Sequence, residues 1–267
     1  MKNNVVKDSS VANYSAMDSI KNPELTKVWG SEPDRWGWGE RLVPDMQADD
    51  SGSRKSTEIS FRRYETAARY AKEKRVLDIA CGVGYGSQML RLAGASSVVG
   101  VDVSSESIEY AKQRYQTPGI EFLCADAEQF QSSRQFDIVV SFETIEHLNN
   151  PIKFLENIHS FLIPGGELIL SVPLGETRHF DPYHLHVFSQ KQVFALLEKT
   201  GFSIDLYRYE EFSLTRSEMD NASKLYPGSN PSTKELFLSF RGWRVIYDYL
   251  IRGGIYMPQL LVVARSI

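Results

Sequence analysis

Residues 76–86 read Val76-Leu77-Asp78-Ile79-Ala80-Cys81-Gly82-Val83-Gly84-Tyr85-Gly86, an apolar strand followed by a turn with glycine at every second position. Glycine adopts a positive φ at no steric cost and lets a ligand approach the backbone closely. The N–H groups at the start of the next helix would point into the same space. About twenty residues further on, the apolar run 98–101 ends at Asp102, where a carboxylate suits two ribose hydroxyls. The stretch therefore predicts a strand, a turn and a helix that hold a nucleotide-like cofactor.

Strands and helices are predicted to alternate along the middle of the chain. The expected strands are 75–80, 97–102, 120–124, 136–142 and 167–173, and the expected helices are 56–72, 86–93, 104–115, 151–162 and 189–200. Such alternation is typical of a doubly wound α/β sheet with parallel strands. Ligands of these sheets bind at the carboxyl ends of the strands, where Asp78, Gly82, Asp102, Asp126 and Glu143 fall.

Five segments occur in the order and with the spacing of a known set of motifs: 77–86, 101–104, 124–127, 136–143 and 162–167. In both respects the chain resembles the class I S-adenosylmethionine-dependent methyltransferases. The resemblance implies a Rossmann-like, seven-stranded sheet with helices on both faces, and S-adenosylmethionine as the cofactor. An NAD-binding fold is disfavoured, because Asp78 makes the first strand acidic and the glycines follow G-x-G-x-G rather than G-x-G-x-x-G.

By this resemblance, ten residues are assigned to the cofactor. They are Asp78, Ala80, Gly82, Gly84, Asp102, Val103, Asp126, Ala127, Phe142 and Glu143. Asp102 would accept from both ribose hydroxyls, which one carboxylate can do with its two oxygens. Asp126 would meet the exocyclic amine of adenine, or else cap its own turn. The three glycines of the turn would pass the methionine moiety, while Asp78 would orient either the turn or the amino group of the ligand.

A second group of residues points to the chemistry. Glu143, Glu146 and His147 are spaced i, i+3 and i+4, so one helical turn would place them on a single face. Four of the five histidines lie at position 147 or in a later loop. That loop contains His179, Asp181, His184 and His186.

Three interpretations of this group stay open. In the first, Glu143, Glu146, His147 and His184 or His186 bind Mg²⁺ or Mn²⁺, which holds two vicinal hydroxyls and lowers the pKa of one. In the second, a histidine such as His147 or His184 removes the hydroxyl proton as a general base, and Glu146 holds its tautomer. In the third, His147 caps a helix and the loop histidines contact solvent.

The acceptor is predicted by resemblance alone. The acidic turn 143–147, followed by the histidine loop, is similar to the metal site of small-RNA 2′-O-methyltransferases, and a related acidic cluster occurs in ubiquinone-pathway O-methyltransferases. Over residues 39–205 the chain resembles bacterial methyltransferases of cell-surface polysaccharide and glycoside biosynthesis. This implies methyl transfer to a hydroxyl of a sugar or glycosylated small molecule. The alternatives are an N-methyltransferase of an aminosugar, a metal-dependent RNA 2′-O-methyltransferase, and a cofactor-binding regulatory protein without turnover.

Composition narrows the expected partners. The 267 residues carry a net charge of −4 with both signs interspersed, so no basic surface is predicted and nucleic acid is disfavoured. The first twenty residues contain no apolar run long enough for a signal peptide or a membrane span, and Cys81 and Cys124 are expected to be reduced thiols. A cytoplasmic enzyme with a small-molecule or saccharide acceptor is therefore expected.

The amino-terminal part is expected to form an arm. Residues 1–55 contain Trp29, Trp36 and Trp38 and end in a predicted loop over 49–55. The tryptophans would either fasten the arm to the core or let it close over the site as a lid.

The methyltransferase domain is expected over 56–267, with an insertion at 210–257 between two closing strands. These strands are predicted at 202–209 and 259–264. Within the insertion, a helix over 236–252 carries aromatic residues at helical spacing. This helix is interpreted as a core or homodimer contact, or as a wall of the acceptor pocket.

Overall fold

The chain is described here by a computed structural model that covers residues 51–175, 184–218, 243 and 246–267. The arm 1–50, the loop residues His179 and Asp181, and most of the helix expected over 236–252 lie outside the described residues. Among the residues that are described, no helix combines the length and the apolar character needed to cross a membrane.

Seven strands form one sheet in the order β3-β2-β1-β4-β5-β7-β6. Their bounds are β1 Arg75–Ile79, β2 Ser97–Asp102, β3 Ile120–Cys124, β4 Phe136–Phe142, β5 Leu162–Pro173, β6 Phe202–Thr215 and β7 Gly254–Ser266. Strands β1 to β5 pair in parallel, and β7 runs antiparallel between β5 and β6. The predicted Rossmann-like, seven-stranded sheet is confirmed.

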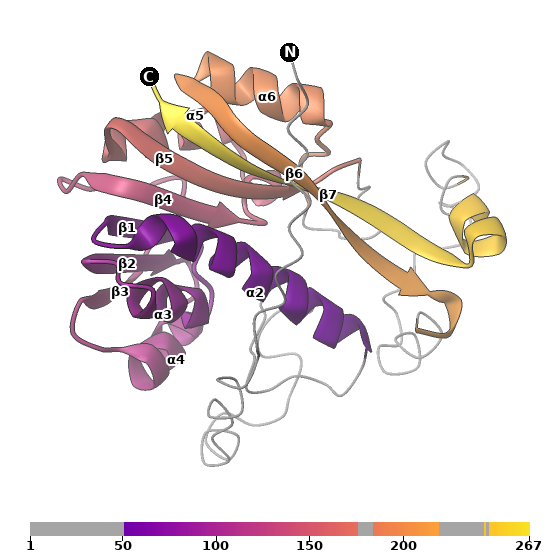
Figure 1. Cartoon of the computed structure of the whole chain (residues 1–267), viewed down its shortest axis with the longest axis horizontal. Coiled ribbons are helices and arrows are strands. Elements are labelled where there is room, and N and C mark those ends of the chain that lie inside the picture. The colour runs from indigo at the N-terminus through magenta and orange to yellow at the C-terminus, as the bar shows by residue number, and fades with distance from the viewer. Residues whose placement is uncertain (1–50, 176–183, 219–242, 244–245) are drawn as a thin grey trace.

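Helices cover both faces of the sheet, as a doubly wound fold requires (Figure 1). Their bounds are α2 Ser51–Ala71, α3 Tyr85–Leu92, α4 Ser105–Tyr115, α5 Pro151–Phe161 and α6 Gln190–Lys199. Apolar side chains of α2, α3 and α4 pack into one core cluster, and those of α5 and α6 pack into a second cluster on the opposite face. The residues of β1 alternate between the two clusters, because successive side chains of a strand point to opposite faces.

Two element bounds differ from the prediction near turns. Helix α2 begins at Ser51, so the loop expected over 49–55 is wrong for residues 51–55. Its first turns are held by Lys55, whose ammonium donates to the Ser213 carbonyl at 3.0 Å and pairs with Glu218 at 2.8 Å. Strand β5 begins at Leu162, five residues before the predicted strand 167–173, and its pairing with β4 is irregular over these added residues.

The last two strands are longer than predicted and form an antiparallel ribbon. Their antiparallel pairing runs from Phe202 opposite Ser266 to Thr215 opposite Gly254, with one shift of register between Ile204 and Leu206. Strand β5 pairs with β7 only from Gln259 onward, so the part of β7 before Gln259 pairs with β6 alone. The segment expected as an insertion at 210–257 therefore begins and ends inside these strands, and only residues 216–253 lie between them.

Candidate active site

The three positions of the turn after β1 require glycine for different structural reasons. Gly82 has a φ of 55°, and a Cβ there would meet nothing within 4 Å. At Gly84, a Cβ would lie 2.7 Å from the Ala111 and Phe122 side chains, and at Gly86 it would lie 1.9 Å from the Tyr64 ring. Gly86 also lacks the positive φ that was expected of it. Only Gly82 thus opens onto space that a ligand could fill, while the other two allow close packing.

Asp78 lies under the turn and is 1% exposed. Its carboxylate accepts from the Ser87 hydroxyl at 2.6 Å and from the Tyr64 hydroxyl at 3.1 Å, which ties β1 to α3 and α2. Burial raises the pKa of Asp78 from 3.8 to about 7, although both hydrogen bonds oppose the rise. Of the two roles considered, this geometry favours orienting the turn over contacting the ligand.

Asp102 ends β2 beside the glycine turn. Its Oδ2 accepts from the Gly82 N–H and its Oδ1 from the Ser104 N–H, each at 2.9 Å. A carboxylate offers about four acceptor positions, so holding two amides is compatible with accepting from ribose hydroxyls. Nearby, Ala80 has a φ of 63° and the Val103 side chain is 61% exposed. These residues fit the cofactor edge that the motif predicts.

Asp126 caps the turn that follows β3. Its Oδ1 accepts from the Glu128 N–H at 2.8 Å, and its Oδ2 accepts from the Gln129 side chain at 3.2 Å. The alternative of a turn cap is therefore realised, and contact with adenine stays a prediction. Ala127 packs against the core cluster of α5, and Phe142 packs edge-on against Tyr64 with ring centroids 5.0 Å apart.

Glu146, His147 and His184 come together where β4 ends. One ligand-type atom of each lies within 4.8 Å of the others. His147 Nε2 lies 3.9 Å from Glu146 Oε1, and the rings of His147 and His184 stand edge to face with centroids 4.6 Å apart. Glu146 and His184 are buried, whereas the His147 side chain is 26% exposed. The structure thus gathers the three residues predicted to be catalytic.

Hydrogen bonds between the turn and the histidine loop hold this cluster together. The turn 144–148 contains a short 3₁₀ helix, Ile145–His147. The Glu146 carbonyl accepts from the N–H groups of Leu185 and His186 at 2.9 and 3.0 Å. His186 Nε2 lies 2.8 Å from the Leu148 carbonyl. His184, and not His186, is therefore the loop histidine that joins the cluster.

Glu143 lies outside the cluster, although it was predicted to be a metal ligand with Glu146. Its Oε1 accepts from the Ser171 hydroxyl at 2.8 Å and lies 3.1 Å from Arg63 Nη1, and its Oε2 accepts from Gln259 at 3.0 Å. The carboxylate is thus committed to α2, β5 and β7. The i, i+3 spacing did not bring the two carboxylates together because Glu143 precedes the 3₁₀ turn, with a φ of 47°.

Arg63 is the site residue that sequence reasoning missed. It lies within the predicted helix 56–72, and only 3% of its side chain is exposed. Its Nε donates to Glu210 at 2.7 Å, and its Nη2 donates to Gln259 at 2.5 Å. Burial alone would lower the pKa of the Arg63 guanidinium, but Glu143 and Glu210 raise it overall, so the group stays charged.

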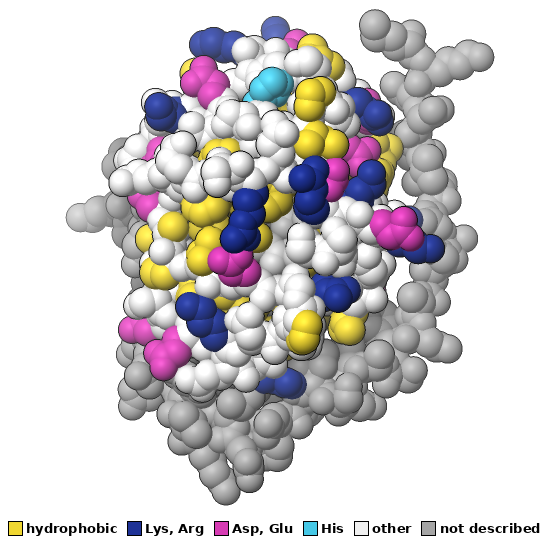
Figure 2. Space-filling model, turned by 90° about the vertical axis from the view of Figure 1, so that its left-hand side faces the viewer, with side chains coloured by type: hydrophobic (Ala, Val, Ile, Leu, Met, Phe, Trp, Pro, Cys, Tyr) yellow, Lys and Arg dark blue, Asp and Glu magenta, His cyan; other side chains and the backbone are white. Residues whose placement is uncertain are grey.

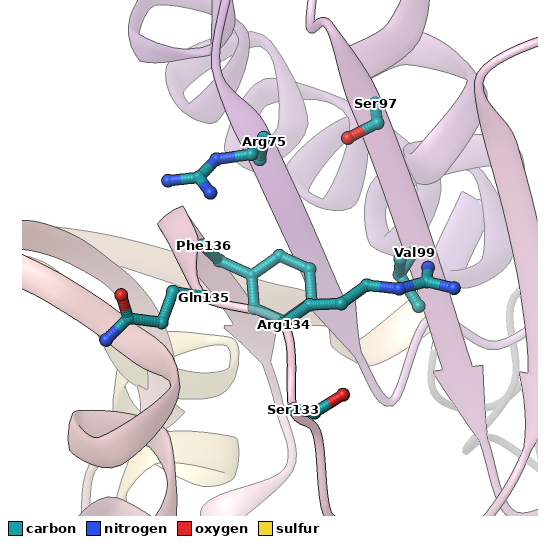
Figure 3. A pocket seen from close by; sticks show the side chains of 7 residues that line it. All are labelled: Arg75, Ser97, Val99, Ser133, Arg134, Gln135 and Phe136. Carbon is teal, nitrogen blue, oxygen red and sulfur yellow. The ribbon is translucent and has the colours of Figure 1, made fainter.

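A cavity of about 390 Å³ lies at the opposite edge of the sheet, near the amino ends of β1, β2 and β4 (Figure 3). Its two arginines are already paired, Arg75 with Asp137 at 2.9 Å and Arg134 with Glu121 at 2.5 Å. Figure 2 shows basic and acidic side chains interspersed on one face of the molecule, in line with the dispersed charge of the sequence. The cavity is thus remote from the cluster and has little net charge to offer a ligand.

Comparison with known proteins relates the central part of the chain to a protein family. Residues 77–170 match the family model described as a methyltransferase domain. The ubiquinone biosynthesis O-methyltransferase of Coxiella burnetii is 35% identical over 131 residues, which are 48% of this chain and 54% of that protein. The chain spans between about half and two thirds of the length of the curated relatives it matches.

Solved structures agree in fold. A candidate methyltransferase of Bacillus halodurans C-125 superposes with a TM-score of 0.61 at 18% identity, covering 78% of this chain and 98% of that one. The N-methyltransferase NodS of Bradyrhizobium japonicum WM9, in complex with S-adenosyl-L-homocysteine, has a TM-score of 0.52 at 17% identity, covering 82% and 89%. These structures share the fold of the chain, and the family match over residues 77–170 supports its assignment to the class I S-adenosylmethionine-dependent methyltransferases.

Proposed function

We propose that this protein is an O-methyltransferase that uses S-adenosylmethionine to methylate a hydroxyl of a sugar or glycosylated small molecule. The observation that carries the proposal is the convergence of Glu146, His147 and His184 at the carboxyl end of β4. The glycine turn and Asp102 lie at the carboxyl ends of the neighbouring strands β1 and β2. These positions support a proton acceptor and a cofactor site at the same edge of the sheet.

The open space at Gly82 and the carboxylate of Asp102 fit the cofactor. Gly82 would let it approach the backbone, and Asp102 would accept from its ribose. When bound, S-adenosylmethionine supplies the methyl group on its positively charged sulfur. The protein residues then have to orient the acceptor hydroxyl and remove its proton.

His147 is the residue best placed to take that proton. It is the most exposed member of the cluster, and the buried Glu146 carboxylate lies 3.9 Å from its Nε2. A neighbouring carboxylate stabilises the imidazolium that forms on proton transfer. His184 packs against the His147 ring from the other chain segment and restricts its orientation.

The same three residues form a candidate site for a divalent cation. One carboxylate and two imidazoles suit Mn²⁺ better than Mg²⁺, which prefers oxygen ligands and a near-ideal octahedral shell. A cation bound there would hold two vicinal hydroxyls and lower the pKa of one, as a sugar diol allows. The O-methyltransferase among the relatives and the resemblance to glycoside methyltransferases support a hydroxyl acceptor.

Calorimetry tests the cation directly. We would titrate Mn²⁺, and separately Mg²⁺, into protein saturated with S-adenosylhomocysteine. Mn²⁺ is expected to bind to the wild type, but not to Glu146→Ala; Glu156→Ala, on the exposed face of α5, is the matched control and is expected to bind Mn²⁺ as the wild type does. Absence of Mn²⁺ binding to the wild type would remove the metal and leave His147 as the base.

A transfer assay tests the acceptor class. Protein and methyl-labelled S-adenosylmethionine would be incubated with nucleotide sugars and glycosides, with aminosugars, and with short RNA. Label is expected in a hydroxyl of a sugar, with activity indifferent to salt. Methyl transfer to an amine, unaffected by chelators, would favour the N-methyltransferase alternative. The N-methyltransferase NodS, which has a similar fold, is the reason to include amines in the assay. Steep loss of RNA binding with salt would favour the 2′-O alternative.

A further inference from the structure

The carboxylate of Glu143 is gripped from three elements at once. Ser171 of β5 and Arg63 of α2 contact one oxygen, and Gln259 of β7 donates to the other. The Glu143 N–H also points to Ser171, 3.2 Å from both its carbonyl and its hydroxyl. A glutamate adopts a φ near 47° only where its surroundings hold it there, because the left-handed region is strained for residues with a Cβ.

This grip lies at the start of the turn that presents Glu146 and His147. The turn leaves β4 at Phe142, and its far end is already fixed by the hydrogen bonds from the histidine loop to the Glu146 and Leu148 carbonyls. The direction in which the chain leaves Glu143 therefore sets the position of the two side chains three and four residues later. A change of a single φ at this point would displace both of them.

Arg63 is the centre of the grip. Its guanidinium contacts Glu143 and also Gln259, which itself contacts Glu143, so it holds the carboxylate directly and through a second side chain. Glu210 provides the second negative charge, and Arg208 pairs with Glu210 at 2.6 Å, so two cations and two carboxylates balance in this group, of which Arg63 is the most buried member. The planar fork of arginine can bind several partners in fixed directions, which a lysine ammonium does not do.

We propose that Arg63 is a positioning residue of the active site: by holding Glu143 in its left-handed conformation, it places Glu146 and His147 for the reaction. The catalytic consequence rests on the proposed function, whereas the placement of the turn does not. In this proposal the backbone conformation of Glu143 positions the turn, and its side chain provides the contacts that hold this conformation.

Histidine NMR spectra test the placement without any acceptor. The variant Arg63→Met is compared with Arg62→Met, which changes the adjacent, exposed arginine of the same helix. In Arg63→Met the ring resonances of His147 are expected to shift, while those of His159, on α5 beside Ile267, stay in place as an internal reference. Arg62→Met is expected to move neither. Arg63→Lys is expected to behave like Arg63→Met, because one ammonium cannot reproduce the fork.

A second variant guards against misfolding of Arg63→Met. Gln259→Leu removes the two hydrogen bonds that Gln259 makes with Arg63 and Glu143, and it leaves the ion pairs of Arg63 in place. It is expected to shift the same His147 resonances by a smaller amount. Native His147 resonances in both folded variants would overturn the proposal.

Kinetics then separate positioning from cofactor binding. With any acceptor found for the wild type, turnover of Arg63→Met is expected to fall about a hundredfold, the usual effect of a catalytic group displaced by an ångström. The Kd for S-adenosylhomocysteine is expected to stay within about threefold, so that the loss appears in kcat. Equal losses in Arg62→Met would count against the proposal. If the wild type transfers no methyl group to any acceptor, the proposed function is wrong. The NMR comparison would still test whether Arg63 positions His147.

Discussion

At the scale of single residues, the glycine turn shows that one motif can combine different physical requirements. Gly82 has a left-handed backbone and an open side toward the carboxyl edge of the sheet, whereas Gly86 has a neighbouring ring where a side chain would begin. A substitution at the first should affect the ligand, and a substitution at the second should affect the core. The sequence pattern, which treats the glycines alike, does not contain this distinction.

Gly86→Ala is expected to destabilise the fold by about 1–3 kcal/mol, as overpacking of a core does, because its Cβ would lie 1.9 Å from the Tyr64 ring. Gly82→Ala is expected to cost about 1–2 kcal/mol from its positive φ alone, and in addition to weaken binding of S-adenosylhomocysteine. Urea unfolding without ligand, followed by calorimetry with it, measures the two effects. Wild-type stability in Gly86→Ala would show that Tyr64 moves aside.

The candidate site could be predicted where its residues lie close together in the sequence. Asp102 follows from the spacing after the glycines, and Glu146 and His147 follow from the acidic turn. Arg63 could not be found in this way, because its partners Glu210 and Gln259 are 147 and 196 residues away. The residues next to an arginine in the sequence do not show that it is buried. On a helix with exposed neighbours, Arg63 is therefore interpreted as a surface charge.

At the scale of elements, prediction worked where local chemistry fixes an end. The helices predicted from 104 and 189 begin there, because Ser104 caps α4 by accepting from the Ser107 N–H and Ser189 forms a capping box with Gln192 at α6. It failed for the ribbon of β6 and β7. Residues 211–215 alternate polar and apolar side chains, but Phe212 and Leu214 are only half-buried, so this short pattern does not build a buried face that would mark a strand.

Ser104→Ala is expected to lower the free energy of unfolding by about 1 kcal/mol, because the first turn of α4 loses its capping acceptor. Ser105→Ala, at the next position and exposed, serves as the control and is expected to change it by less than about 0.5 kcal/mol. Urea unfolding at one pH gives both values. Equal effects of the two substitutions would show that the hydroxyl at 104 contributes nothing as a cap.

At the scale of the whole molecule, the buried Asp78 links stability to pH. Its pKa is about 7 in the folded chain and near 3.8 when exposed, so the folded state binds the proton more tightly. Its contribution to stability is fully present below pH 3.8, decreases as the pH rises through the window up to about 7, and is lost above it. Asp78 is thus a carboxyl group that makes the fold less stable at alkaline pH.

Asp78→Asn removes this titration while retaining a side-chain oxygen for Tyr64 or Ser87. The stability of the wild type relative to Asp78→Asn is expected to fall as the pH rises from 5 to about 7 and then to level off. Thermal unfolding of both proteins at several pH values measures the difference and cancels the other titrating groups. A constant difference across this range would show that Asp78 keeps an ordinary pKa.

The grip of Arg63 also has a consequence for the order in which the protein matures. Helix α2 is made before any strand of the sheet, yet two of the three partners of Arg63 lie on β6 and β7, the last strands to be synthesised (Figure 1). Until those strands emerge and dock, Arg63 lacks two of its three partners, and Glu143 lacks its hydrogen bond from Gln259. A nascent chain could therefore build its parallel strands early, but it would acquire a competent centre only in the final step of folding, as domains assembled from distant segments do.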